Sequence, residues 1–170
     1  MKRESKRLKE WKRRWNPLSN KERNIVQEYL LRFGVDINQL KGKIIRIEKR
    51  VFLVTEDVYG ILKQYGGEGI YAAGIEMGVL HDEFEPSISC ADIIAELSGE
   101  KIVINEKGEQ LFSYGRDVFL SNIVERGSAG EKIVINEKGE VLGIGYFNGE
   151  MLENVVDKGF YLRGKKGRSR

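Results

Sequence analysis

Basic and aromatic side chains near the C-terminus have the types and spacing to bind a polyanion that carries stacking groups. The ring of Tyr161 lies among several cations. These cations are Lys158, Arg163, Lys165, Lys166 and Arg168. Aromatic faces stack on unpaired bases while Lys and Arg hold phosphates, so the segment suits single-stranded or looped RNA. In an alternative interpretation, compatible with the first, Phe160 and Leu162 close the preceding domain and the basic residues simply follow it.

The segment 114–118, with the sequence Tyr-Gly-Arg-Asp-Val, is a second candidate contact. Arg116 follows Gly115, which has no side chain to keep a phosphate or a base away from the backbone. A tight turn between a helix and a strand, with Arg116 facing solvent, explains the same residues equally well.

Signals for catalysis are weak. His81 is the single histidine, which excludes a metal site built on several histidines. Cys90 stands near the start of a predicted helix, which could lower its pKa, and it could pair with His81 as nucleophile and base. We favour a small buried thiol and an ordinary surface histidine. We therefore expect no enzymatic activity, no cofactor and no metal ion.

The net charge of +3 hides a strong asymmetry along the chain. Residues 1–15 carry eight basic and two acidic side chains, and residues 161–170 carry five basic and no acidic ones. The 145 residues between them carry 16 basic and 24 acidic side chains. Two basic ends on an acidic body attract polyanions with an affinity that falls as salt rises. This pattern favours a nucleic-acid partner over tails that only aid solubility.

Residues 1–15 form a basic arm, in which Leu8, Trp11 and Trp15 share one face of a predicted helix. The face could dock on the protein's own body, stack its Trp rings on unpaired bases, or bind a partner or a membrane surface. Docking on the body is the commonest fate of such a stripe, and the narrow apolar face makes a membrane the least favoured.

The composition is that of a folded protein with one medium or two small domains: 170 residues, 41% of them hydrophobic and 32% charged. No apolar run approaches the roughly 20 residues that span a bilayer, and the basic start lacks the apolar segment of a secretory signal. A single cysteine excludes an intrachain disulfide and fits a reducing compartment.

Residues 16–98 predict a sandwich-like α/β domain with two longer helices. Ser19 begins the first helix with a capping box, and Gly34 ends it. Thr55 caps the second helix, which runs to Tyr65.

β-branched runs add a sheet to this N-terminal domain. The predicted strands are 43–47, 51–54, 70–80 and 84–88. Residues 48–50 turn between the first two strands, and glycine bends or breaks the third. A short helix over 89–97 leads to a domain boundary near Ser98.

An eleven-residue sequence occurs twice, at 99–109 and at 130–140. Each copy contains Lys-Ile-Val-Ile, which predicts a short buried strand. After the second copy, alternation continues the strand pattern, with one face formed by Leu142, Ile144 and Tyr146. The end of that copy is therefore a hairpin turn with Gly139 at positive φ. After the first copy, a short helix that ends at Gly115 is predicted, with one side formed by Leu111, Phe112 and Tyr114.

Several segments together resemble one protein family. Asn16-Pro-Leu-Ser19 precedes the first helix, and Arg50-Val-Phe-Leu-Val-Thr55 leads into the second. Phe84-Glu-Pro-Ser-Ile-Ser-Cys-Ala-Asp92 runs toward the C-terminal half, which contains Gln110-Leu-Phe-Ser-Tyr-Gly-Arg-Asp-Val118. Their order, over roughly residues 16–162, resembles the Nip-seven family of archaeal and eukaryotic assembly factors for the large ribosomal subunit. The C-terminal part resembles a PUA domain.

This resemblance implies an α+β protein in which the α/β domain at 16–98 is followed by a PUA-type β-barrel with a basic tail at 99–170. It also implies a non-catalytic protein that binds RNA and contacts other assembly factors. The PUA loop corresponds to Gly115, Arg116 and Asp117, and the basic C-terminal surface to Lys158, Arg163, Lys165 and Lys166. Many PUA domains have glycine where this chain has Asn122, and asparagine also tolerates the left-handed conformation.

Our first hypothesis is a monomeric factor that binds single-stranded or looped precursor RNA of the large subunit. It would work in the cytoplasm of an archaeal-type cell, or in the nucleolus of a eukaryote, without a membrane. The alternatives are an accessory factor of RNA modification, a translation-associated protein that binds transfer or ribosomal RNA, and a protein-interaction adaptor whose barrel binds no RNA. The first alternative is disfavoured because residues 16–98 show no catalytic aspartate or methyl-donor loop.

Overall fold

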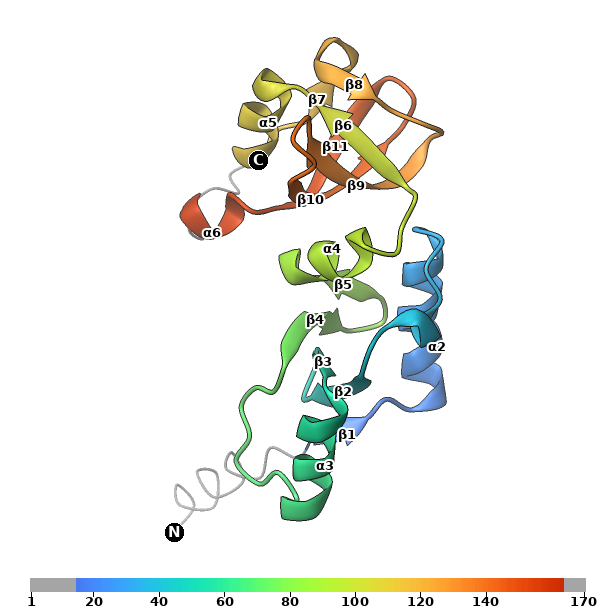
Figure 1. Cartoon of the computed structure of the whole chain (residues 1–170), viewed down its shortest axis with the longest axis vertical. Coiled ribbons are helices and arrows are strands. Elements are labelled where there is room, and N and C mark those ends of the chain that lie inside the picture. The colour runs from blue at the N-terminus through green and yellow to red at the C-terminus, as the bar shows by residue number, and fades with distance from the viewer. Residues whose placement is uncertain (1–14, 164–170) are drawn as a thin grey trace. The chain divides into compact units, whose positions relative to one another are not determined.

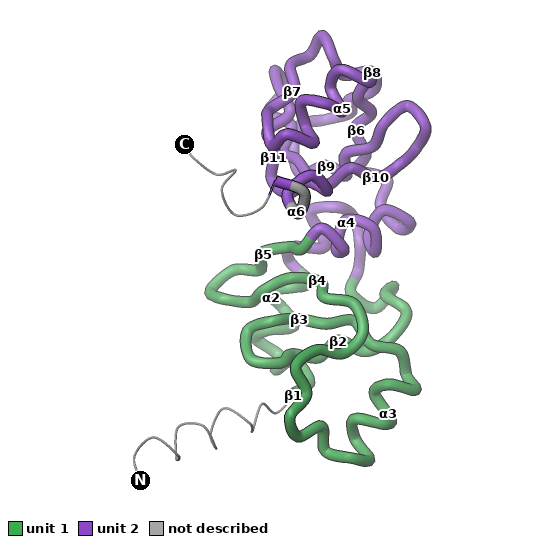
Figure 2. The backbone as a smooth tube through the Cα atoms, turned by 90° about the vertical axis from the view of Figure 1, so that its left-hand side faces the viewer, with its two compact units in different colours: residues 1–27, 37–87 green, residues 28–36, 88–170 purple. Residues whose placement is uncertain are grey.

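The computed structural model describes residues 15–163, which divide into two compact units (Figures 1 and 2). Residues 15–27 and 37–87 belong to the first unit, and residues 28–36 and 88–163 belong to the second. The architecture confirms the predicted α+β fold, with a sheet in the N-terminal part and a nearly closed barrel in the C-terminal part.

The first unit is built on a five-stranded antiparallel sheet in the order β1-β2-β3-β4-β5. Its strands are β1 (Trp15–Pro17), β2 (Lys43–Ile47), β3 (Arg50–Val54), β4 (Ile75–Leu80) and β5 (Phe84–Pro86). The helices of the N-terminal part are α2 (Asn20–Leu31), the short 3-10 helix η1 (Ile37–Gln39) and α3 (Glu56–Tyr65). The core of the first unit contains Ile45, Ile47, Phe52, Val54 and Leu62.

Local signals fix the N-termini of both longer helices as predicted. The backbone N–H of Ser19 donates to Glu22 Oε2 at 2.8 Å, and the N–H of Glu22 donates to Ser19 Oγ at 3.3 Å. This reciprocal capping box begins α2. At α3, Thr55 Oγ1 accepts from the N–H of Val58 at 3.3 Å.

The second unit contains a six-stranded sheet in the order β7-β11-β10-β9-β6-β8. The strands are β6 (Lys101–Ile104), β7 (Val118–Phe119), β8 (Ile123–Glu125), β9 (Gly130–Asn136), β10 (Val141–Phe147) and β11 (Met151–Asp157). Its helices are α4 (Ile88–Ala95), α5 (Glu106–Ser113), the 3-10 helix η2 (Leu120–Asn122) and α6 (Phe160–Arg163). The edge strands β7 and β8 are joined directly by η2, which nearly closes the sheet into a barrel.

Helix α5 packs against β6, β7, β10 and β11 and contributes Phe112 to the barrel core. The rest of this core includes Ile102, Ile104, Val118, Val134, Leu142, Phe147 and Leu152. Gly108 allows the close approach of the helix, because a Cβ there would lie 2.9 Å from the carbonyl oxygen of Asn122.

The two copies of the repeat end in different structures, as the sequence predicts. The first ends in α5, and the second ends in the β9–β10 turn, where Gly139 has φ of 81°. Their strands pair with each other in parallel, but with an offset of one residue, so that Lys101 lies opposite Ile133 rather than Lys132.

The structure corrects several predictions for the first half of the chain. The strand predicted over 70–80 begins only at Ile75, after Gly74 at φ of 67°. Ile88 belongs to α4 rather than to β5, and Arg50 lies in β3 rather than in the preceding turn. Trp15 lies in strand β1 rather than on a helix.

The ring of Trp15 packs on the protein's own core, edge-on to Tyr59 with a centroid distance of 5.5 Å. For this residue, docking on the body is therefore the observed fate. Leu8 and Trp11 lie outside the described residues.

In the barrel, two tyrosines that were predicted to share a face with apolar residues are exposed. Tyr114 is 72% exposed and Tyr146 is 42% exposed, whereas Phe147 takes the core position on β10. Asn122 lies in η2 without a left-handed conformation, and among the described non-glycine residues Glu48 alone has a positive φ.

Candidate nucleic-acid interface

The C-terminal end of α5 positions the loop that contains Arg116. The N–H of Gly115 donates to the Phe112 carbonyl at 2.9 Å, and the N–H of Arg116 donates to the Leu111 carbonyl at 3.0 Å. With Gly115 at φ of 75°, these two bonds form a Schellman motif, which ends the helix as predicted. Arg116 consequently leaves the helix end in a defined direction and is exposed to solvent.

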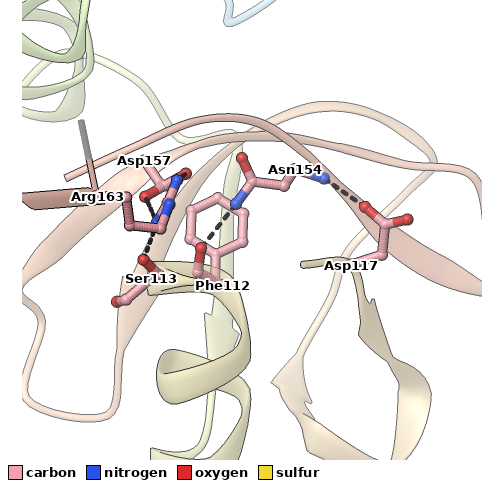
Figure 3. Close-up of polar contacts among 6 residues, drawn as sticks. All are labelled: Phe112, Ser113, Asp117, Asn154, Asp157 and Arg163. Carbon is pink, nitrogen blue, oxygen red and sulfur yellow. Dashed lines mark hydrogen bonds and ion pairs between the residues drawn. The ribbon is translucent and has the colours of Figure 1, made fainter. Parts of the chain in front are cut away.

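Strand β11 holds this loop on both sides (Figure 3). Asn154 Nδ2 donates to the Phe112 carbonyl at 2.8 Å, and the backbone N–H of Asn154 donates to Asp117 Oδ1 at 2.9 Å. A single residue of the barrel thus donates a further hydrogen bond to a carbonyl of the last helical turn and also anchors the residue after Arg116.

Arg163 anchors the same helix end from α6 (Figure 3). Its Nη1 and Nη2 donate to the two carboxylate oxygens of Asp157 at 2.9 Å each, and Nη1 also donates to the Ser113 carbonyl. Hydrogen bonding to Asp157 raises the pKa of the Arg163 guanidinium. The Asp157 side chain is only 4% exposed, so Arg163 neutralises a buried carboxylate. Gly159 leaves the space for this arrangement, since a Cβ there would collide with the Ser113 carbonyl.

Two grooves flank α5. The smaller one, about 440 Å³, we call the basic groove; it is lined by Lys107, Gln110, Leu111, Tyr114 and Arg116. The larger one, about 800 Å³, we call the acidic groove; its lining includes Glu106, Glu109, Gln110, Tyr114, Glu137 and Lys138. Gln110 and Tyr114 line both grooves, so the exposed Tyr114 ring stands where they meet.

The helical period explains the separation of charge. Lys107, Leu111 and Tyr114 follow the spacing i, i+4, i+7, whereas Glu106, Glu109 and Ser113 follow i, i+3, i+7. Each set forms one stripe along the helix, and the two stripes are neighbours. Within residues 15–163, neither Lys107 nor Arg116 forms an ion pair with a carboxylate, so both charges face solvent.

Comparisons with known proteins agree with this architecture. The family model described as "NIP7/UPF0113, pre-PUA domain" matches residues 15–88, and the one described as "UPF0113 PUA domain" matches residues 100–166. The chain belongs to the NIP7/UPF0113 family. A protein described as "UPF0113 protein" from Archaeoglobus fulgidus is 31% identical over 130 residues, which are 65% of this chain and 75% of the relative.

A solved structure, described as that of a conserved PUA domain protein from Thermoplasma acidophilum, shares the fold of this NIP7/UPF0113 member. Its TM-score is 0.55 at 16% identity, over 87% of this chain and 96% of the other. The family models and the Archaeoglobus fulgidus relative confirm the resemblance to the Nip-seven family inferred from the sequence.

The eight residues that were predicted to bind RNA do not all lie in one place in this family member. Gly115 and Arg116 lie at the end of α5, and Arg163 lies beside them in its pair with Asp157. Lys158 is exposed but its Nζ lies 3.1 Å from Asp92 Oδ1, which reduces its effective charge. The remaining predicted contacts lie outside what the structure describes: the Tyr161 side chain, Lys165, Lys166 and Arg168.

Sequence reasoning missed three lining residues of the basic groove. Lys107, Gln110 and Leu111 were not predicted as contacts, although the spacing of i, i+3, i+7 places Lys107 and Gln110 on one helix face with Tyr114. An exposed aromatic residue at that spacing from a lysine was the available signal.

The candidate catalytic pair is not supported. Cys90 is fully buried in α4, and burial raises the pKa of its thiol to about 12, opposite to the lowering that a helix start could cause. His81 is exposed, and its Nδ1 lies 3.3 Å from Lys49 Nζ. Among the described residues, no three or more His, Cys, Asp and Glu side chains gather in a way that could hold a metal ion. None of the described helices has the length and apolar character to cross a membrane.

Proposed function

We propose that this protein is a non-catalytic RNA-binding factor in the assembly of the large ribosomal subunit, and that its PUA barrel binds precursor ribosomal RNA. Membership of the NIP7/UPF0113 family supports the assembly role, because the Nip-seven proteins that the sequence resembles are assembly factors. The observation that carries RNA binding is the Arg116 loop on a PUA barrel, with an exposed tyrosine and two cations that pair with no carboxylate of residues 15–163 in one groove.

The proposed RNA contacts fall into two groups, those on the barrel and those in the C-terminal tail. Lys107 and Arg116 present cations on the barrel, whereas Lys165, Lys166 and Arg168 belong to a basic tail that adds phosphate contacts without selecting a base. Tyr161 and Lys158 are proposed as further RNA contacts on the basis of the sequence. Arg163 supports the surface from within through Asp157 rather than by offering a free charge.

The test is binding of the full-length chain to labelled single-stranded, hairpin and duplex RNA of equal length over a series of salt concentrations. We expect micromolar or tighter binding that prefers unpaired RNA and weakens as salt rises. The double variant Lys165→Glu, Lys166→Glu should weaken binding to all three RNAs alike. Absence of binding to any RNA would favour a protein-interaction adaptor.

A second measurement separates the assembly role from a role in translation. Tagged full-length protein should be recovered with precursors of the large subunit and with other assembly factors, and should behave as a monomer when free. Recovery with mature subunits or transfer RNA instead would favour the translation-associated alternative. Turnover of a modified nucleotide by the purified protein would contradict the non-catalytic assignment.

A further inference from the structure

We propose that one unpaired nucleotide straddles Tyr114, with its base stacked on the ring toward the acidic groove and its phosphate in the basic groove. The proposal rests on RNA binding as the proposed function and specifies the ligand of the α5 surface. It assigns base stacking to Tyr114, and phosphate recognition to Lys107 and Arg116.

Tyr114 has the properties of a preformed stacking platform. The residue is 72% exposed and lines both grooves, so its ring is open to a ligand where the grooves meet. Its backbone N–H donates to the Leu111 carbonyl at 3.1 Å, and the Schellman motif, Asn154 and Arg163 hold the neighbouring residues. Since the backbone is already ordered, stacking would require little further loss of conformational entropy.

The charges on either side of the ring orient the nucleotide. Lys107 and Arg116 attract a phosphate on the basic side, whereas three carboxylates repel it on the other side: Glu106, Glu109 and Glu137. Lys138 is a further cation of the acidic groove, but it is outnumbered there because Arg163 is committed to Asp157. The backbone of the RNA should therefore follow the basic groove.

The same carboxylates can also hold the edge of the base. Ionised carboxylates only accept hydrogen bonds, and they pair well with exocyclic amino groups such as N4 of cytosine. Adenine, cytosine and guanine carry such a group, and uracil offers its N3–H as a donor instead. Glu109 is held in place by Asn136 Nδ2 at 3.2 Å, so at least one acceptor of the groove is oriented in advance. The site should therefore accept an unpaired nucleotide with any of the four bases.

The first test uses Tyr114→Ala and Tyr114→Phe in the full-length chain, with Tyr146→Ala as a matched control. Tyr146 is also an exposed tyrosine of the barrel, but it lines neither groove. With a hairpin RNA that has one unpaired cytosine, Tyr114→Ala should lose about 5- to 100-fold in affinity with an unchanged salt slope. Tyr114→Phe and Tyr146→Ala should stay within about threefold of the unmodified chain, since stacking needs only the ring.

The second test varies charge and base. Lys107→Gln and Arg116→Gln should each lower the salt slope by about 0.7, the value for one phosphate contact to a single strand. Replacing the unpaired cytosine by uracil should change the affinity by less than about threefold, because stacking on an aromatic ring tolerates every base.

The outcomes distinguish failure of the subsite from failure of the function. Intact RNA binding that is indifferent to Tyr114→Ala would overturn the subsite while leaving the proposed function in place. Salt slopes that do not change in Lys107→Gln and Arg116→Gln would overturn the phosphate assignment. No RNA binding by the unmodified chain would overturn both.

Discussion

Asn105 and Asn136 occupy the same position in two identical eleven-residue segments, and their side-chain oxygens direct the chain into different structures. Asn105 Oδ1 accepts from the N–H of Gly108 at 2.9 Å and caps α5. Asn136 Oδ1 accepts from the N–H groups of Lys138 at 3.0 Å and Glu140 at 2.9 Å, and closes the β9–β10 turn. Asparagine suits both roles, so the residues outside the repeat decide between helix and turn.

The glycines of the two copies should respond differently to substitution. At Gly139, a Cβ would meet no atom within 4 Å, but φ is 81°, so Gly139→Ala should cost about 1–2 kcal/mol through backbone strain. Gly139→Asn should cost less, because asparagine tolerates that conformation. At Gly108, φ is not strained, but a Cβ would lie 3.0 Å from Ile104 Cβ and closer still to the Asn122 carbonyl.

We therefore expect Gly108→Ala to destabilise the protein even though alanine is the better helix former by about 1 kcal/mol. Gly108→Asn should be worse, which is the reverse of the order at Gly139. Urea unfolding followed by circular dichroism gives the free energies. A stabilised Gly108→Ala variant would show that α5 can move away from the barrel without penalty.

The sequence was sufficient to predict the start or end of a helix wherever that boundary depends on residues close by in the chain. The capping box at Ser19, the cap at Thr55 and the helix end at Gly115 all depend on neighbours within five positions, and the structure has each of them. The strand over residues 70–80 was predicted too long because its start depends on contacts with a strand that is distant in sequence. Gly74 lies so close to that strand that a Cβ there would collide with the Leu53 carbonyl.

The repeat itself could not predict which face of each of its two strands points into the barrel core. The barrel core contains Ile102 and Ile104 of the first copy but Val134 of the second, which corresponds to Val103. Identical residues thus present opposite faces, because the strands pair with an offset of one residue and side chains alternate with period two.

The candidate interface was predictable only in part for a similar reason. Arg116 beside Gly115 was visible in the sequence, but the engagement of Arg163 depends on the Ser113 carbonyl, which is distant in sequence and belongs to another element. A run of cations near a chain end does not reveal which of them neutralises a buried carboxylate.

Lys132 and Glu100 should respond unequally to substitution. The Lys132 side chain is only 2% exposed and pairs with Glu100, which is 44% exposed. Glu100→Gln would leave a buried ammonium without its carboxylate and should cost about 1–3 kcal/mol. Lys132→Met keeps the buried volume and returns Glu100 to water, so it should be neutral or stabilising. Thermal and urea unfolding of both variants test the order, and a more damaging Lys132→Met would require a second stabilising partner for the ammonium.

Cys90 should make the stability fall at high pH. Its pKa is raised by burial from 9.0 to about 12, so the folded state holds the proton that the unfolded state begins to lose near pH 9. The contribution is fully present below pH 9 and is lost as pH rises toward 12. Relative to Cys90→Ala, the stability of the unmodified chain should fall by about 2 kcal/mol between pH 7 and pH 10.5. If the difference in stability between the two proteins does not change with pH, the thiol ionises as easily in the folded state as in the unfolded state.

The anchoring of the Arg116 loop by Asn154 can be measured at the backbone. Asn154→Ala removes the donor to the Phe112 carbonyl, which also accepts from the N–H of Gly115. We expect the amides of Gly115 and Arg116 to exchange hydrogen about fivefold faster or more, since one hydrogen bond contributes on the order of 1 kcal/mol.

The matched control is Asn148→Ala, which removes another barrel asparagine whose Nδ2 donates to Glu153 at 3.0 Å. Exchange at Gly115 and Arg116 should be unaffected in that variant. RNA affinity should fall together with protection in Asn154→Ala, because the cation at Arg116 is then no longer held in one direction. Faster exchange without any loss of affinity would mean that the order of the loop is structural and that RNA binding does not depend on it.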